Sequence, residues 1–221
     1  MTQNDFPFWK DLTGAQQNRL ERAAKEELFK AGTILHSGAD DCSGLFLVRK
    51  GRLRAYIISE EGKELTLYRL LERDICLFSA SCVMNSIQFQ VMVAAEEDTL
   101  VLHIPAEVYR ELMDTSLAVA NYTSRLMASR FTDVMWLMDQ VLYKKMDTRI
   151  AAFLLEESQL TGREELKLTH EQIANHLGSA REVVSRLMKH FQEDGLVTLK
   201  RGSVVLNDPE GLEELAEGSL R

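Results

Sequence analysis

A run of regularly spaced residues between positions 117 and 141 constrains the fold of this chain more than any other feature. Its members, nearly all apolar, are Leu117, Ala120, Ser124, Met127, Phe131, Val134, Met138 and Val141. Steps that alternate between three and four residues follow one face of an α-helix and do not fit the two-residue period of a strand. At 1.5 Å per residue, the predicted helix is about 36 Å long.

Two packing partners are compatible with this apolar stripe. One is the body of the same chain, which would make the segment a core helix of a monomer. The other is the same helix of a second copy. A spacing that persists for more than three heptads is typical of helices that pair with another helix. We therefore predict a dimerisation helix and a homodimer, with the stripe as its interface.

Short runs of β-forming residues precede Pro105, separated by turn residues such as Lys50-Gly51. The predicted strands are residues 33–36, 45–48, 53–58, 65–70, 91–94 and 100–104. Short strands with hairpin turns between them predict a small antiparallel roll or barrel. In front of them, near-helical spacing of residues predicts a helix from Asp11 to Phe29.

The overall charge limits where a polyanion can bind. The chain carries 26 Lys and Arg against 34 Asp and Glu, a formal net charge of −8. No overall positive field therefore attracts it to DNA or to an anionic membrane. A basic binding surface has to be local. The composition is otherwise that of an ordinary globular protein, with 45% apolar and 27% charged residues, so we expect most of the chain to be folded.

Several features predict a soluble, cytoplasmic protein without a membrane partner. Residues 1–10 contain no basic segment followed by an apolar run, as a secretory signal would. No segment approaches the roughly 18 consecutive apolar residues of a membrane-spanning helix. Cys42, Cys76 and Cys82 are an odd set without a CxxC pair, which fits a reducing compartment better than a disulfide scaffold.

Residues 169–191 contain the pattern that is most informative about function. Thr169 is followed three residues later by Gln172, and Ser179 is followed in the same way by Glu182. Each pair predicts a capping box, in which the two residues satisfy each other's backbone N–H groups at the start of a helix. The sequence therefore predicts two short helices in close succession.

The residues between these two starts predict how the helices cross. Ala174 is small, as a close helix crossing requires, and Gly178 follows four residues later at the place where the chain leaves the first helix, a position suited to positive φ. Val184 follows after six more residues and, with Leu187, gives the second helix its inward face. This spacing is that of a DNA-binding helix-turn-helix.

The second helix, predicted from Ala180 to about Gln192, is then the one that contacts base edges. Helical spacing places five polar residues on a face largely opposite Val184 and Leu187. Arginine can pair with guanine through two hydrogen bonds, glutamate can accept one from cytosine, and serine is adaptable. The predicted DNA-contacting residues of this face are Arg181, Glu182, Ser185, Arg186 and Lys189.

Further DNA contacts are predicted outside this face. They are Thr169 and Ser179 at the helix starts, and Lys200 and Arg201 in the predicted turn of a hairpin that spans residues 196–206. A hairpin tip beside a recognition helix suits phosphate contacts. Residues 179–202 contain five basic and three acidic residues, a net charge of +2. The predicted site is thus a basic patch on an acidic protein.

Five of these residues also have a purely structural explanation. Glu182 is required by its capping box whether or not DNA is bound. Arg181 and Lys189 could be ordinary solvated charges, since most exposed charges on helices bind no ligand. Lys200 and Arg201 could be simple turn residues. The set as a whole indicates DNA binding more strongly than any member.

This order of elements resembles the Crp/Fnr family of bacterial transcription regulators, and the resemblance covers nearly the whole chain. It implies an α+β fold: an N-terminal antiparallel β-roll, which is a jelly roll like that of cyclic-nucleotide-binding domains, then a long dimerisation helix and a C-terminal winged helix-turn-helix. The expected domains are residues 1–110, 111–144 and 145–221. The resemblance also implies control by a small-molecule or redox signal at the β-roll.

The recognition residues are similar to those of two branches of the family. Glu182, Ser185 and Arg186 resemble the branch that recognises TTGAT-like half-sites. Arg181 with Glu182 and Arg186 is similar to the branch that recognises TGTGA. The resemblance therefore implies an inverted repeat of one kind or the other. Activation of transcription would also need a surface that contacts RNA polymerase, and no spacing rule identifies one.

The β-roll departs from the family members that bind cyclic nucleotides. Those members carry a Gly-Asp pair, a Gly-Glu pair and an Arg followed by Ser or Thr, which hold the ribose and the cyclic phosphate. Here the matching stretches read Arg73-Asp74-Ile75-Cys76-Leu77-Phe78 and Phe89-Gln90-Val91. A phosphate needs charge-assisted donors to offset its desolvation. The resemblance thus argues against cyclic AMP and favours an apolar or aromatic effector, or none, at a pocket of Leu77, Phe78, Phe89 and Gln90.

Neither a metal site nor an iron–sulfur cluster is expected. The iron–sulfur branch of the family carries a cysteine cluster near its N-terminus, whereas only three cysteines are present here, too few for a four-thiolate site. Cys76 and Cys82 are either a redox pair or, as burial statistics favour, reduced buried thiols. Haem bound by His36 and His103 is not favoured, because a lone strand histidine is usually structural.

The competing functional class is an enzyme. It would use Cys76 or Cys82 as nucleophile and His103 as base. The sequence contains no triad-like spacing, metal motif or glycine-rich phosphate loop to support that chemistry. We therefore predict a DNA-binding regulator that is not an enzyme.

Overall fold

The computed structural model describes residues 5–38, 44–77 and 90–220. The chain divides into two compact units, one formed by residues 1–58 and 67–134 and the other by residues 59–66 and 135–221. Within the described ranges, none of the helices combines the length and the apolar character needed to cross a membrane.

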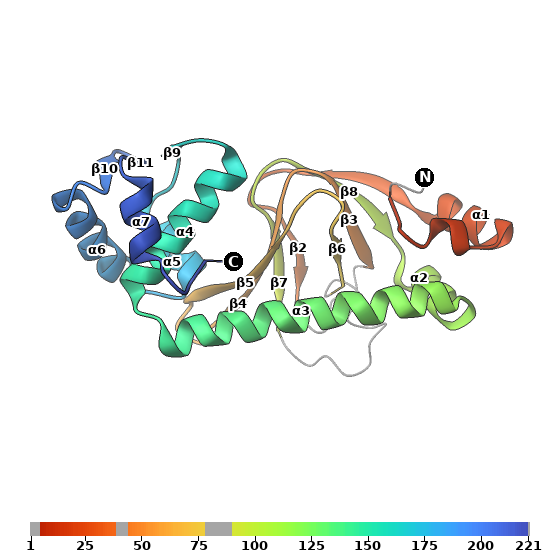
Figure 1. Cartoon of the computed structure of the whole chain (residues 1–221). Coiled ribbons are helices and arrows are strands. Elements are labelled where there is room, and N and C mark those ends of the chain that lie inside the picture. The colour runs from red at the N-terminus through yellow and green to blue at the C-terminus, as the bar shows by residue number, and fades with distance from the viewer. Residues whose placement is uncertain (1–4, 39–43, 78–89, 221) are drawn as a thin grey trace. The chain divides into compact units, whose positions relative to one another are not determined.

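The first unit is built on two antiparallel sheets, which Figure 1 displays beside the first part of helix α3 (Leu117–Tyr143). Their strand orders are β1-β8-β3-β6 and β2-β7-β4-β5. The strands are β1 (Lys25–Phe29), β2 (Ile34–Ser37), β3 (Leu45–Lys50), β4 (Leu53–Ile58), β5 (Glu64–Leu70), β6 (Ile75–Cys76), β7 (Met92–Ala95) and β8 (Thr99–Ile104). The predicted antiparallel roll is confirmed. The ends of the six predicted strands differ by at most two residues from those observed, and the short strand β6 was not predicted.

Strand β3 explains how this roll is held together. Four consecutive residues, Leu45 to Val48, are buried, and their side chains alternate between two apolar cores. Phe46 and Val48 belong to the core that also takes residues from β4 and β7 of the other sheet. Leu45 and Leu47 belong to the core that the helices of this unit cover. One sheet is thus buried on both faces, which is why β3 is a continuous apolar run.

The helical elements of the first unit are a 3-10 turn (Trp9–Asp11), α1 (Gly14–Ala23), α2 (Ala106–Thr115) and the start of α3 (Leu117–Tyr143). Each of the three helices contributes a buried residue to the same core, namely Leu20, Tyr109 and Val119. The Tyr109 hydroxyl lies 2.6 Å from Oγ1 of Thr123 in α3, and that threonine donates to the Val119 carbonyl at 2.9 Å. A buried hydrogen-bonded pair therefore joins α2 to α3.

The helix expected from Asp11 to Phe29 is wrong at both ends. Helix α1 begins after Thr13, whose side chain and that of Gln16 form a capping box, and it stops at Ala23. Residues 25–29 form β1 instead, paired with β8 along its whole length. Pairing with residues 70 to 78 positions away along the chain outweighs the weak local helix propensity, and neighbouring residues give no sign of that pairing.

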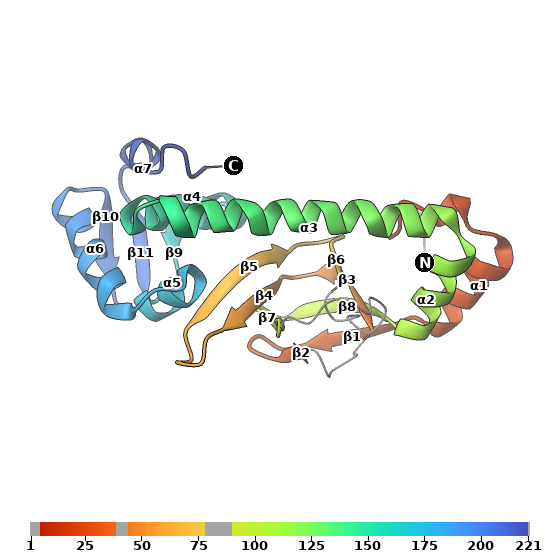
Figure 2. The same cartoon turned by 90° about the horizontal axis from the view of Figure 1, so that it is seen from below.

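Helix α3 confirms the long helix predicted from the apolar stripe. The stripe residues differ in their exposure. Leu117 and Phe131 are 76% and 67% exposed, and Met138 and Val141 are also exposed. Met127, by contrast, packs partly against the core of the first unit. Figure 2 displays α3 along its full length. Four of the eight stripe residues are therefore large apolar side chains that this single chain leaves exposed.

The second unit contains four helices and a small sheet. Its helices are α4 (Met146–Thr161), α5 (His170–Leu177), α6 (Arg181–Glu193) and α7 (Pro209–Leu215). Strands β9 (Glu165–Leu166), β10 (Val197–Lys200) and β11 (Ser203–Leu206) form a sheet in the order β10-β11-β9. Residues of α4, α5, α6 and the sheet, among them Leu154, Ile173 and Val184, share one core. The predicted helix-turn-helix followed by a hairpin is confirmed.

We expect Tyr109→Phe to lower the free energy of unfolding by about 1 kcal/mol, the net contribution of a typical hydrogen bond. The substitution keeps the ring and removes the bond to Thr123. Tyr122→Phe is the matched control, since Tyr122 is a partly buried tyrosine of α3 that packs on the same core, and no hydrogen bond of its hydroxyl is recorded among the described residues. Urea denaturation measures both; equal losses in the two variants would contradict the assignment.

Candidate nucleic-acid interface

Helix α5 begins with the first of the two predicted capping boxes. The Thr169 hydroxyl accepts a hydrogen bond from the Gln172 backbone N–H at 3.2 Å. The Gln172 side-chain oxygen in turn accepts from the Thr169 backbone N–H at 2.8 Å. Two N–H groups that the helix itself cannot pair are thereby satisfied. The start of α5 is fixed to a single residue by local chemistry.

The turn after α5 depends on a left-handed residue, as predicted. Gly178 has a φ of +67° and donates its N–H to the Ala174 carbonyl, and the Ser179 N–H reaches the same carbonyl at 3.0 Å. The Leu177 carbonyl accepts from the guanidinium of Arg149 in α4 at 2.7 Å. Burial lowers the pKa of Arg149. These bonds hold the end of α5 against α4 and direct the chain into α6.

The second predicted capping box, of Ser179 with Glu182, is wrong. The N-cap residue of α6 is Ala180, and its side chain makes no capping bond. The turn consists of residues 178 to 180. The Ser179 N–H, which the Glu182 side chain would accept from in a capping box, instead donates to the Ala174 carbonyl at the end of α5. Glu182 therefore does not close a box, and the structural explanation for a glutamate at this position no longer applies.

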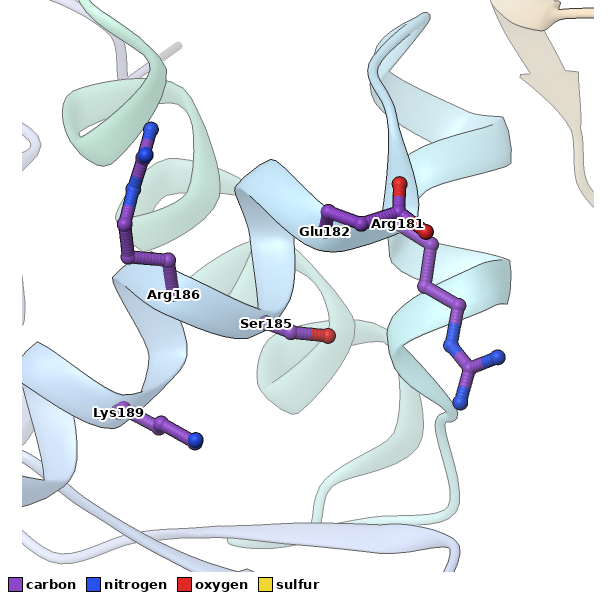
Figure 3. Close-up of a pocket in the computed structure, with 5 residues that line it drawn as sticks. All are labelled: Arg181, Glu182, Ser185, Arg186 and Lys189. Atoms are coloured by element: carbon purple, nitrogen blue, oxygen red, sulfur yellow. The ribbon is translucent and has the colours of Figure 1, made fainter.

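Helix α6 has one buried face and one exposed face. Val184, Met188 and Phe191 are buried in the core of the second unit. The five predicted DNA-contacting residues instead line a single open pocket (Figure 3), and they are Arg181, Glu182, Ser185, Arg186 and Lys189. The sequence-based placement of this exposed face is confirmed.

Figure 3 also shows that the five side chains do not all point the same way. Ser185 and Lys189 project to the same side of α6 as Arg181, whereas Arg186 projects away from them. The guanidinium of Arg181 lies 4.0 Å from a carboxylate oxygen of Glu171, and both side chains are largely exposed. Such a pair is weak and readily exchanged for another anion. Within the described residues, Arg186 and Lys189 have no recorded ion-pair partner.

The hairpin after α6 has the predicted turn, with Gly202 at a φ of +78°. Lys200 is not a solitary turn residue, because its ammonium group lies 3.2 Å from Oε1 of Glu165 in β9. The Ser203 hydroxyl donates to the same oxygen at 3.1 Å. Hydrogen bonds from Lys200 and Ser203 lower the pKa of Glu165. Arg201 is exposed at the tip.

Sequence analysis missed one contact to the exposed face of α6. Nδ1 of His170, the first residue of α5, lies 2.9 Å from the Ser185 hydroxyl oxygen. Burial, together with the positive charge of Arg181, lowers the pKa of this histidine. The two residues are 15 positions apart on different helices, so no local spacing rule relates them. Only the crossing of α5 over α6 brings them together.

The predicted effector residues are placed only in part. Leu77 is buried in the helix-covered core of the first unit, and Gln90 is exposed. Phe78 and Phe89 lie outside the described residues. The pocket that these four residues were expected to form stays a prediction.

The cysteines and histidines singled out in the sequence are also placed in part. Cys76 is fully buried in β6, and Phe46 of β3 lies between it and His103 in the sheet register. His103 contacts Glu27 at 3.0 Å, whereas His36 is buried in the other sheet. Cys42 and Cys82 lie outside the described residues. This arrangement gives no support to the alternative with a Cys76 nucleophile and a His103 base.

Comparisons with known proteins agree on one kind of protein. Residues 26–116 match the model of the cyclic nucleotide-binding domain, and residues 148–215 match that of the Crp-like helix-turn-helix domain. The chain is 30% identical over 216 residues to the transcriptional activator protein FnrA of Stutzerimonas stutzeri, covering 92% of this chain and 87% of that protein. It is 28% identical over 209 residues to the fumarate and nitrate reduction regulatory protein of Escherichia coli, covering 90% of this chain and 80% of that protein.

A solved structure from Eubacterium rectale, described as a transcriptional regulator of the Crp/Fnr family, is similar along almost the whole chain. The TM-score is 0.95 and the sequence identity is 52%, with 97% of this chain and 100% of that chain covered. These relatives are transcription regulators and not enzymes.

We expect Thr169→Ala to lower the free energy of unfolding by about 1 kcal/mol, because it removes a helix cap. Ser179→Ala should leave it nearly unchanged, because Ser179 does not cap α6. Thr169→Ser, which keeps the hydroxyl, is the control for the first substitution. Denaturant unfolding of the full chain measures all three. If Ser179→Ala lowers the free energy of unfolding as much as Thr169→Ala does, Ser179 caps α6 after all and the finding is contradicted.

Proposed function

The chain belongs to the Crp/Fnr family of transcriptional regulators, and on that premise we propose that it binds an inverted repeat in double-stranded DNA as a homodimer. DNA binding by its helix-turn-helix follows from the family. The proposal adds the symmetry of the complex, the contacting residues and the half-site. It also assigns a role to each of three domains: residues 1–110 form the sensor, residues 111–144 the dimerisation helix and residues 145–221 the DNA-binding domain.

The observation that carries the proposal is the exposed face of α6. Its residues offer two guanidinium groups, one ammonium group, one carboxylate and one hydroxyl around one open pocket. Arginine can bond to guanine O6 and N7 at once, and each good pair of this kind contributes about 1 to 3 kcal/mol of discrimination. With Val184 and Met188 buried beneath it, this face is free to enter a major groove.

The residues of this face favour two half-sites. Glu182, Ser185 and Arg186 fit a TTGAT-like half-site, and Arg181 with Glu182 and Arg186 fits a TGTGA-like one. Thr169, Ser179, Lys200 and Arg201 supply phosphate contacts in this proposal. The ion pair between Lys200 and Glu165 has to loosen when Lys200 turns to a phosphate.

The proposal places the dimer interface on the apolar stripe of α3. Leu117 and Phe131 leave most of their surface in water, and removing such apolar surface from water drives association. The stripe continues through Met138 and Val141, which are also exposed. Met127 contributes less, because it packs partly within its own chain. A two-fold dimer of this kind presents two α6 helices, which an inverted repeat with half-sites about 34 Å apart would match.

The signal at the β-roll is proposed to be a small molecule or a redox change. The missing phosphate clamp argues against cyclic AMP. An effector acts only through its different affinity for the DNA-binding and non-binding states. Addition of cyclic AMP is therefore expected to leave DNA binding unchanged.

The direct test is an electrophoretic mobility shift with the purified full chain. The probes are palindromes of TTGAT and of TGTGA half-sites, with a scrambled duplex of the same length as control. The proposal expects one palindrome to be bound far more tightly than the scrambled duplex, with affinity that falls steeply with salt. Weak binding of equal strength to all three duplexes would reject it.

We expect Arg186→Gln to reduce base discrimination and Lys200→Gln to reduce affinity for all sequences. Arg186→Gln should cost about 1 to 3 kcal/mol of discrimination at one base pair. Lys200→Gln should weaken binding to every sequence alike and reduce the slope of log K against log salt by about 0.9, the loss of one phosphate contact. Fluorescence anisotropy across a salt series measures both; loss of discrimination from Lys200→Gln would contradict the proposed roles.

We expect Phe131→Glu to abolish or strongly weaken the dimer, because a charge in a paired apolar seam is left without a partner. Leu28→Glu is the matched control, since Leu28 in β1 is exposed to a similar extent, 61% against 67%, and lies off the stripe. Analytical ultracentrifugation gives the mass of each variant. If Phe131→Glu remains as dimeric as Leu28→Glu, the stripe is not the interface.

A further inference from the structure

We propose that His170 is a positioning residue that holds the Ser185 hydroxyl in one orientation and thereby sharpens the choice of base at one position of each half-site. The inference rests on the proposed function, in which α6 contacts base edges. It assigns a role to a side chain that belongs to α5 and lies outside the exposed face of α6.

The first step is geometric. His170 Nδ1 lies 2.9 Å from Ser185 Oγ, within the range of a hydrogen bond. The histidine follows directly on Thr169, whose capping box fixes the backbone at that point. The ring is half-buried rather than free in solvent. Ser185 thus contacts a group whose own position is set by the start of α5.

The second step concerns what a serine can offer to DNA. A free serine has three staggered side-chain rotamers, and its hydroxyl can rotate between donating and accepting. An unrestrained hydroxyl therefore suits several base edges about equally. A hydrogen bond to His170 selects one rotamer and uses one of the hydroxyl's bonding directions.

The third step follows from the ring nitrogen. If Nδ1 carries no proton, it accepts the serine proton and leaves the oxygen lone pairs for a base amino group. If Nδ1 carries a proton, it donates to the serine oxygen and leaves the hydroxyl proton for a base carbonyl or ring nitrogen. In the first case the hydroxyl can only accept from the groove, and in the second its proton faces the groove with one lone pair remaining. Either bond removes one of the hydroxyl's bonding options and fixes its direction. Discrimination at that base pair is higher than a freely rotating hydroxyl provides.

The charges around the ring agree with a neutral histidine. Burial lowers the pKa of His170, and the positive charge of Arg181 in α6 lowers it further. Glu171, the next residue of α5, faces Arg181 at 4.0 Å. A neutral ring avoids an extra positive charge beside Arg181 and can still bond to Ser185 through Nδ1.

The test measures base preference rather than overall affinity. The full-length wild type and the variants Ser185→Ala, His170→Phe and the double variant are titrated by anisotropy against the inverted repeat that the wild type binds. The panel contains every symmetric single-base-pair change of that repeat. We expect Ser185→Ala and His170→Phe to lose discrimination by about threefold to tenfold at the same base pair, the range of one net hydrogen bond. The double variant should lose no more than either single variant.

Two conservative variants separate positioning from a general packing role. His170→Asn carries an amide group near the place of Nδ1 and should retain most of the discrimination. His170→Gln carries its amide farther out and should behave like His170→Phe. Melting temperature and affinity for a scrambled duplex report on folding and on phosphate contacts, and neither should separate Asn from Gln at this position.

The outcomes are distinguishable from failure of the proposed function. If the wild type shows no preference among the duplexes, the proposed function itself is wrong. If the wild type is selective but His170→Phe keeps its full discrimination, or loses it at a base pair other than the one affected by Ser185→Ala, only the role of His170 is overturned. Equal loss in His170→Asn and His170→Gln would overturn it as well.

Discussion

The burial of one face of α6 is the constraint on which the proposed site depends. Val184, Met188 and Phe191 are held in the core of the second unit, and a helix that buries one stripe has to expose the opposite one. The polar side chains of the opposite stripe, which include Arg181, Ser185 and Lys189, therefore lie outward. Their orientation is first a consequence of apolar packing, and Arg181 and Ser185 are held further by contacts with Glu171 and His170.

The turn before α6 converts this packing into a fixed direction. Gly178 supplies the left-handed residue, and the guanidinium of Arg149 in α4 donates a hydrogen bond to the Leu177 carbonyl. Neither group belongs to the exposed face. They hold the end of α5 where the chain turns into α6, and the crossing of these two helices brings His170 into contact with Ser185. The positioning proposed for Ser185 thus depends on residues of three helices.

Charge in this protein acts locally. The whole chain carries a net charge of −8, yet the segment around α6 and the following hairpin is basic. Screening in physiological salt limits the reach of exposed charges to about 8 Å, so a phosphate at α6 experiences the nearby arginines and lysines more than distant carboxylates. The Lys200–Glu165 pair adds a competing partner for one of these cations. An acidic protein can therefore bind DNA through a small basic surface.

The sequence by itself determined the features that depend on neighbours along the chain. The 3.5-residue period specified α3, the Thr169 and Gln172 pair specified the start of α5, and Gly178 specified its end, because each rests on contacts within a turn or two of helix. The tertiary structure alone decided the rest. Residues 25–29 became β1 because β8 offers them a complete row of hydrogen bonds. Ser179 lost its capping role because its N–H is used to close α5, and His170 met Ser185 only because two helices cross. Such long-range pairings leave no periodic trace in a single sequence, since the partners are set by packing and not by spacing.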